Sequence, residues 1–172
     1  MDRMKGLGEP CSPASVLLTL REPFIGLSYS MSIEDIRADF AILDDWEDRY
    51  RYLIELGRGL SPLPEALRTD ANKVRGCASQ VWLASTSQRN AAGIPVLEFR
   101  GDSDAHIVRG LIAVLFALFH GKTAEEILGT DAHAVFAELG LKEHLTPQRS
   151  NGFFSMVERI GRDARTLTAT DA

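Results

Sequence analysis

One cysteine of the 172-residue chain has the setting of a reactive thiol. Cys77 follows Gly76 at the end of a proline-containing connector, directly before a stretch typical of a β-strand. The glycine allows a sharp backbone turn, so we expect a loop tip to present the thiol. The cations of Lys73 and Arg75 would favour the thiolate, which is the nucleophilic form. The alternative is that Cys77 is a small buried side chain at a strand start, as free cysteines commonly are.

A cysteine hydrolase is a second chemistry that the sequence leaves open. It would pair the Cys77 thiol with an imidazole that acts as a base. The chain has four histidines, all on or beside expected helices: His106, His120, His133 and His144. No spacing requires any of them to approach the cysteine. The hypothesis therefore needs an imidazole nitrogen within reach of the thiol in the folded protein.

Metal, nucleotide and nucleic-acid sites are not indicated. Two cysteines, Cys11 and Cys77, exclude a four-cysteine zinc site and a framework of several disulfides. Cys11 lies close to two prolines and has no reactive setting. No phosphate loop or dinucleotide fingerprint is present, so we expect neither a metal nor a cofactor. With 19 Lys and Arg against 24 Asp and Glu, the net charge is −5, and no basic block suggests nucleic-acid binding.

The hydrophobic pattern predicts the elements that would position the thiol. Helical spacing of apolar residues predicts helices from Ser32 to Leu43, from Asp44 or Asp45 to Gly57, from Ala105 to Phe119, from Thr123 to Leu128, from Ala132 to Leu139, and from Ser150 onward. Residues 80–86 and 94–100 have strand composition and form a hairpin, with room for a short extra strand before Cys77. The polar segment 101–104 is expected to cap the helix that starts at Ala105.

Strands clustered between helices indicate the α+β class, with a small antiparallel sheet, either a hairpin or a three-stranded meander, packed against helices. The length fits one domain. We expect a poorly structured extension over residues 1–30, the folded domain over 31–165 and a frayed tail over 166–172, with Met31 as a candidate alternative start. The longest apolar run, Leu111 to Phe119, is too short to cross a membrane.

Three segments together resemble the SufE family of sulfur-acceptor proteins, which includes the CsdE proteins. In chain order they are Gly76-Cys77-Ala78-Ser79-Gln80-Val81-Trp82, then Gly101-Asp102-Ser103-Asp104-Ala105 with Ile107-Val108-Arg109-Gly110-Leu111-Ile112-Ala113, and finally His144-Leu145-Thr146-Pro147 with Arg149-Ser150. The likeness runs from about Ser32 to Ala164. It implies a fold shared with the NifU and IscU scaffolds, which agrees with the α+β prediction.

The resemblance implies that Cys77 accepts sulfane sulfur, as a persulfide, from a cysteine desulfurase and stimulates that enzyme. The sulfur would then pass to an iron–sulfur cluster assembly scaffold, and the pyridoxal phosphate would belong to the desulfurase. Asp102 and Arg149 match polar positions of the family near the cysteine loop, and with Arg75 we expect them at the desulfurase interface. The implied protein is a cytoplasmic accessory protein, not an enzyme, and it binds neither nucleic acid nor a membrane.

Three alternatives stay open beside this interpretation: a CsdE-like route through a specialised desulfurase, the cysteine hydrolase, and an adaptor whose thiol is incidental. A persulfide carried between partners needs shielding from solvent. We therefore expect the free protein to hold Cys77 against the sheet or the core helix and to release it on docking.

Overall fold

The computed structural model describes residues 31–170, and the expectations for residues 1–30, Cys11 and residues 171–172 lie outside this range. The described chain forms seven α-helices, one short 3-10 helix and two strands. Their bounds are α1 (Ile33–Ile42), α2 (Trp46–Arg58), η1 (Glu65–Leu67), β1 (Val81–Arg89), β2 (Pro95–Ser103), α3 (His106–Phe119), α4 (Ala124–Gly129), α5 (Ala132–Glu138), α6 (Leu141–His144) and α7 (Pro147–Thr170). Both strands lie between helical stretches, so the α+β class is confirmed.

The sheet is the hairpin form of the prediction. β1 and β2 pair antiparallel from Val81 opposite Ser103 to Arg89 opposite Pro95, so both strands continue beyond the ends that their composition predicts. Asn90 closes the turn, because its side-chain oxygen accepts hydrogen bonds from the backbone N–H groups of Ala92 and Ile94.

Local capping explains where several helices begin. α1 and α4 each start with a reciprocal capping box, formed by Ser32 with Asp35 and by Thr123 with Glu126. Asp45 caps α2 by accepting a hydrogen bond from the backbone N–H of Asp48. These starts confirm the sequence predictions.

Two other helix starts and one helix end were predicted wrongly. Segment 101–104 does not cap α3: its first three residues continue β2, and α3 begins at His106 after Ala105, which makes no side-chain cap bond. α7 begins at Pro147 instead of Ser150, since proline suits the first helical position. α7 also continues through the expected frayed tail as far as Thr170. The short helix α6 was not predicted.

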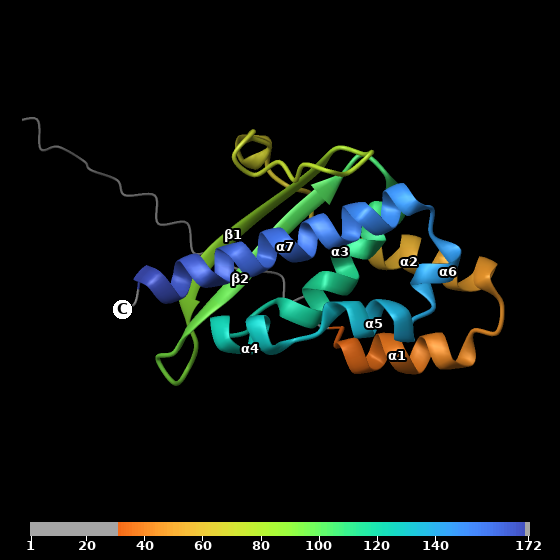
Figure 1. Cartoon of the computed structure of the whole chain (residues 1–172), viewed down its shortest axis with the longest axis horizontal. Helices are drawn as coiled ribbons and strands as arrows, with labels where there is room; N and C mark the ends of the chain where they lie inside the picture. Colours follow the sequence, from red (N-terminus) through yellow and green to blue (C-terminus); the bar gives the residue numbers. More distant parts are fainter. Residues whose placement is uncertain (1–30, 171–172) are drawn as a thin grey trace, which may run out of the picture.

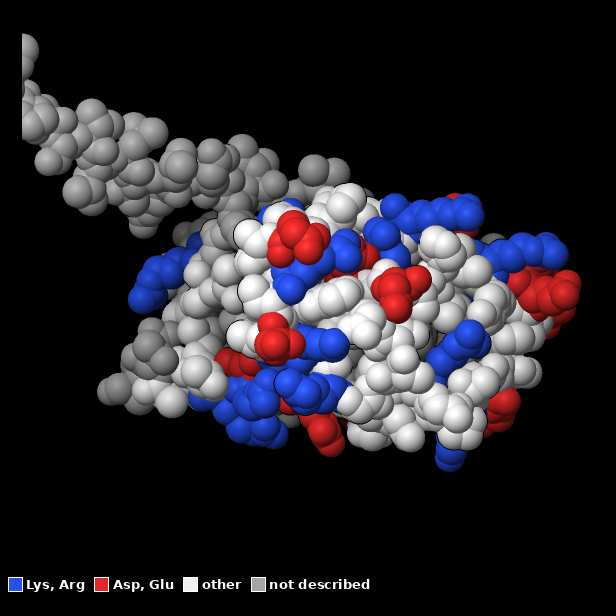
Figure 2. Space-filling model, turned by 90° about the horizontal axis from the view of Figure 1, so that it is seen from above, with Lys and Arg blue, Asp and Glu red and all other residues white. Residues whose placement is uncertain are grey.

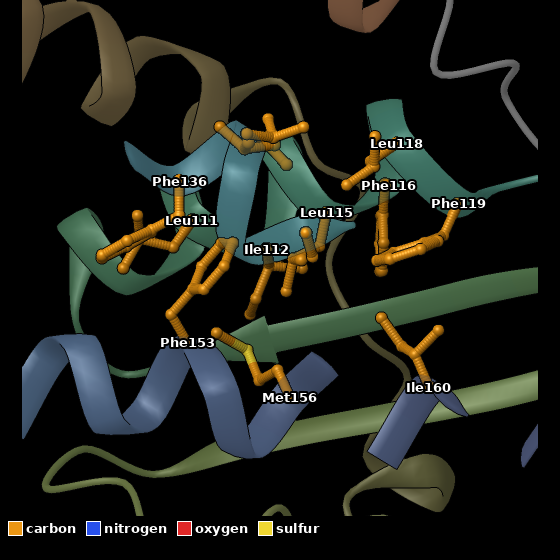
Figure 3. Packing of buried hydrophobic residues seen from close by; sticks show 14 of the residues in the cluster. Leu111, Ile112, Leu115, Phe116, Leu118, Phe119, Phe136, Phe153, Met156 and Ile160 are labelled. Atoms are coloured by element: carbon orange, nitrogen blue, oxygen red, sulfur yellow. The ribbon is translucent and has the colours of Figure 1, made fainter. Parts of the chain in front are cut away.

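Helix α3 forms the centre of the molecule, as its apolar composition predicts. Figure 1 shows α3 inside the structure, with α7 crossing the hairpin. In Figure 3 the side chains of Phe153, Met156 and Ile160 point from α7 toward the buried side chains of α3. Phe136 from α5 packs against Phe153, with ring centroids 4.6 Å apart. This packing fixes the position of α7 and, with it, the position of the surface that α7 presents to other segments of the chain.

Two glycines let α2 and α3 approach each other at backbone distance. A Cβ added at Gly110 would overlap the carbonyl oxygen of Leu53, and one added at Gly57 would lie 2.6 Å from the backbone nitrogen of Gly110. Arg109 secures the crossing by donating hydrogen bonds to the carbonyl oxygens of Gly57 and Leu60. The α2 end of the connector is thereby fixed to the core helix.

None of the helices within residues 31–170 has the length and apolar content needed to cross a membrane. The longest, α7, has 24 residues and is amphipathic: it buries Phe153, Met156, Ile160 and Ala164 and turns charged residues outward.

Candidate functional site

Cys77 lies on a short loop that is closed at its base. The backbone N–H of Val74 donates to the carbonyl oxygen of Val81 at 2.9 Å, and the N–H of Leu83 donates to that of Asn72 at 2.7 Å. These bonds join the end of the connector to the start of β1, so residues 75–80 project as a loop. The extra strand expected before the cysteine is present only as a single bridge, between Lys73 and Trp82.

The cysteine loop rests on the N-terminal half of α7. Gly76 has φ +90°, and a Cβ there would lie 2.7 Å from the Ser155 hydroxyl oxygen. A Cβ on Gly152 would overlap the Cys77 sulfur. Gly152 and Ser155 are three residues apart, so they share one helix face. The small side chains of this face provide the space in which the loop and its thiol lie.

The Cys77 thiol is half-buried, and its pKa is raised above the usual value. Burial is the largest cause, because it disfavours the charged thiolate. A hydrogen bond from the Ser79 backbone N–H opposes it, and the negative charge of Asp104 adds to it. The expectation that Lys73 and Arg75 favour the thiolate is therefore wrong for this conformation. The thiol is protonated at neutral pH, which makes the free protein a poor nucleophile.

Asp104 connects the far end of the cysteine loop to the end of β2. Its carboxylate accepts a hydrogen bond from the Gln80 backbone N–H at 3.0 Å, and its own N–H donates to the Gln80 carbonyl oxygen at 3.3 Å. The sequence suggests this residue only as part of a helix cap. In the structure it holds the loop and also places a negative charge near the thiol.

Replacing Asp104 by asparagine is expected to lower the pKa of Cys77. The amide keeps an oxygen for the Gln80 N–H but removes the negative charge that raises the thiol pKa. The thiolate fraction at neutral pH then increases, and alkylation of the Cys77 peptide by iodoacetamide shifts to lower pH. The pH–rate profile, measured by mass spectrometry from pH 6 to about 10, checks this. Asp44→Asn, an equal charge change between α1 and α2, serves as control, and an Asp104→Asn profile that coincides with the control would contradict the assignment.

Asp102, expected at the desulfurase interface, is a buried ion-pair partner. Its side chain is 3% exposed, and its carboxylate lies 2.7 Å from Arg68 and 3.3 Å from Arg109. The Ser103 backbone N–H also donates to it, at 2.8 Å. Arg68 in turn lies over the Trp82 ring, 5.2 Å from its centroid. Asp102 thus joins the connector and α3 to the sheet, and any interface role, which stays a prediction, would act through the two arginines.

Arg75 and Arg149, the other two expected interface residues, flank the cysteine loop. Arg75 is exposed and belongs to the loop itself. Arg149 lies in the first turn of α7, one turn before Gly152, and makes no ion pair with any residue in the range 31–170. Their role in docking also stays a prediction.

No imidazole is positioned to activate the thiol within the described part of the chain. His120 accepts a hydrogen bond at Nδ1 from the Phe99 backbone N–H, while His133 and His144 stack on aromatic rings. His106 is exposed at the start of α3. No histidine is among the groups that shift the Cys77 pKa. The geometry therefore gives the hydrolase hypothesis no support, and no cluster of potential metal ligands occurs over residues 31–170.

The sequence alone does not predict the roles of Gly152 and Ser155 beside the Cys77 loop. The available signal was a glycine within a predicted helix, which often marks a close approach of another segment. Which segment approaches depends on the fold, since α7 is far from the cysteine loop along the chain.

The fold and the loop-borne thiol define a small α+β protein with one candidate reactive cysteine in its described part. The profile of the SufE family, an Fe-S metabolism associated domain, matches residues 34–164. The chain therefore belongs to the SufE family.

Two similar proteins are from rhizobia. An uncharacterised SufE-like protein of Rhizobium meliloti (strain 1021) is 55% identical over 133 residues, which is 77% of this chain and 94% of that protein. One from Rhizobium etli is 52% identical over 141 residues, which is 82% of this chain and 95% of that protein. The solution structure of a hypothetical protein from Thermus thermophilus has the same fold, with a TM-score of 0.64 and 18% identity, covering 81% of this chain and 99% of that one.

Proposed function

We propose that this protein is a sulfur acceptor of iron–sulfur metabolism and that Cys77 carries the sulfur. The sulfur comes from a persulfide on a cysteine desulfurase and passes on to an iron–sulfur cluster scaffold. The observation that carries the proposal is the position of the thiol, which is half-buried on a closed loop and lies against Gly152 of α7. Membership of a family of Fe-S metabolism proteins supports the choice of substrate.

The transfer is a thiol exchange without net oxidation or reduction. The Cys77 thiolate attacks the terminal sulfur of the donor persulfide, a new sulfur–sulfur bond forms, and the donor's own sulfur–sulfur bond breaks. The donor cysteine leaves as a thiolate and takes up the proton that Cys77 gave up. Such an exchange depends on thiolate fraction and access. The acceptor therefore needs no base, metal or oxyanion hole of its own.

In the proposal, docking changes both the thiolate fraction of Cys77 and the access of the donor to its sulfur. In the free protein, burial and Asp104 raise the pKa of Cys77 and keep the thiol protonated, which protects it from unrelated electrophiles. A partner that lifts the loop from α7 removes the burial, which is the largest cause of the raised pKa, and gives the sulfur access to the donor. The shelter includes a helix that the sequence does not suggest, since the sulfur lies against Gly152 of α7.

The protein acts in this proposal as an accessory protein in the cytoplasm, where thiols are kept reduced. The pyridoxal phosphate that cleaves cysteine belongs to the desulfurase. A specialised desulfurase route of the CsdE kind would use the same chemistry at Cys77, so the choice of route depends on the partner.

The test is the rate at which the host's cysteine desulfurases form alanine from cysteine, with and without this protein. Alanine formation counts each cysteine that the desulfurase cleaves, whereas sulfide release also requires a reductant to free the transferred sulfur, so the reductant is kept at the same concentration with and without this protein. We expect one desulfurase to be stimulated several-fold, because removal of its persulfide frees it for another turnover. Serum albumin at the same thiol concentration controls for nonspecific thiols. Stimulation of none of the host's desulfurases beyond the albumin control would overturn the proposal.

A further inference from the structure

A groove with a volume of about 590 Å³ lies between the connector and the outer face of α7. Half of its ten lining residues are cations: Lys73, Arg75, Arg159, Arg162 and Arg165. Only Asp70 and Glu158 among the lining residues are acidic. Figure 2, seen from above the view of Figure 1, shows Lys and Arg side chains gathered at the lower left of the molecule, with a few acidic side chains beside them. We call the groove lined by these ten residues the basic groove.

The cations of the basic groove are not a reflection of composition, because the chain as a whole carries a net charge of −5. One of them, Arg159, is held by Asp163 at 2.9 Å and by the carbonyl oxygen of Ala71 at 3.0 Å. The other four make no ion pair with residues 31–170. A concentration of unpaired cations in a concave surface attracts a negatively charged ligand.

The basic groove is continuous with the cysteine loop. Ser155 lines the groove and also lies against Gly76, and Arg75 lines the groove two residues before Cys77. A ligand seated in the groove therefore contacts the segment whose position controls the thiol.

We propose that the basic groove binds an acidic segment of the cysteine desulfurase, and so aligns the donor persulfide with Cys77. This inference rests on the proposed function and names the surface through which the partner docks. The match is one of charge: a segment rich in Asp and Glu would pair with the four unpaired cations. Pairing with Arg75 would also pull on the loop at its N-terminal end, away from Ser155.

Two other possible ligands of the basic groove match its positive charge less well. Residues 1–30 of this chain contain three acidic residues, Asp2, Glu9 and Glu22, against three basic ones, Arg3, Lys5 and Arg21, so they offer no net negative charge. Nucleic acid would extend beyond the groove over a molecule with net negative charge, and it would also meet Asp70 and Glu158.

The test reverses two groove cations that lie far along α7 from the cysteine loop, in the double variant Arg162→Glu with Arg165→Glu. Affinity for the desulfurase is measured by titration calorimetry, and the concentration for half-maximal alanine formation is measured in parallel. At low salt we expect the affinity to fall, and the half-maximal concentration to rise, by about tenfold or more relative to the wild type. At high salt we expect the difference between variant and wild type to shrink.

The control variant, Arg58→Glu with Lys142→Glu, makes the same charge change on α2 and α6. Equal weakening in the two variants, or none in the groove variant, would overturn the inference. Tighter binding of the wild type to a labelled RNA or DNA oligonucleotide than to the desulfurase would also overturn it. Circular dichroism and thermal melting check folding, and Arg162→Gln with Arg165→Gln replaces the reversal if it does not fold. A wild type that stimulates no desulfurase would instead reject the proposed function.

Discussion

Replacement of Cys77 by alanine is expected to reduce alanine formation to the desulfurase's own basal rate. The thiol is the only group of the proposed exchange that this chain supplies, so its loss removes the reaction and not merely part of its efficiency. The fold should tolerate the change at a cost of about 1 kcal/mol, because the side chain is small and half-buried. The rate of alanine formation by the desulfurase, measured with the wild type and with the variant, checks this prediction.

Binding of the Cys77→Ala variant separates chemistry from docking. Calorimetry should give a desulfurase affinity close to that of the wild type, since the groove and the flanking arginines are unchanged. Cys11→Ala should retain full stimulation and is the matched control for loss of a thiol. Full stimulation by Cys77→Ala would contradict the sulfur-acceptor account and favour an adaptor whose thiol is incidental.

Replacement of Gly152 by alanine is expected to drive the Cys77 thiol out of its shelter. The added Cβ would overlap the sulfur, and the helix around it is fixed by the buried side chains of Phe153 and Met156. The loop must therefore move. Once exposed, the thiol loses the burial that raises its pKa, and both access and thiolate fraction increase. Alkylation of the Cys77 peptide by iodoacetamide at neutral pH should accelerate several-fold.

Gly161→Ala is the matched control on the same helix. Its Cβ would lie in ordinary contact, 3.8 Å from the Arg165 guanidinium. Both substitutions gain about 1 kcal/mol of intrinsic helix propensity, so a difference in alkylation rate reports on the displaced loop alone. Equal rates for Gly152→Ala, Gly161→Ala and the wild type would show that α7 does not restrain the thiol.

The parts of the fold that were predictable depend on local signals. Capping boxes at Ser32 and Thr123, and the apolar composition of the helix ending at Phe119, identify elements without knowledge of their neighbours. In segment 101–104, by contrast, tertiary contacts override the local signal. Its polar residues are typical of a helix cap, but pairing with β1 and the ion pairs of Asp102 extend the strand instead.

The candidate site was predictable only in its central residue. Cys77 follows from its glycine neighbour, the connector and the family resemblance. The direction of its pKa shift does not, because the pKa is raised mainly by burial and also by Asp104, which approaches from the end of the other strand, while neither Lys73 nor Arg75 is among the groups that shift it. The contact with Gly152 likewise depends on tertiary packing between segments far apart in the chain.

A sheltered thiol gives an acceptor a simple form of selectivity. In the proposed mechanism, the protein holds the Cys77 thiol protonated and against α7 until a partner surface that fits the loop and the basic groove engages both. Charge in the groove would govern how readily the partner binds, and displacement of the loop would govern reaction. The two steps can be separated, because Arg162 and Arg165 lie on later turns of α7 than Gly152.

The most direct test is the intact mass of this protein after incubation with its desulfurase and cysteine, without reductant. The account predicts an added mass of about 32 Da, one sulfur atom, that dithiothreitol removes, that peptide mapping assigns to Cys77, and that Cys77→Ala lacks. An unchanged mass with an active, stimulated desulfurase, or sulfur located on Cys11 instead of Cys77, would contradict it.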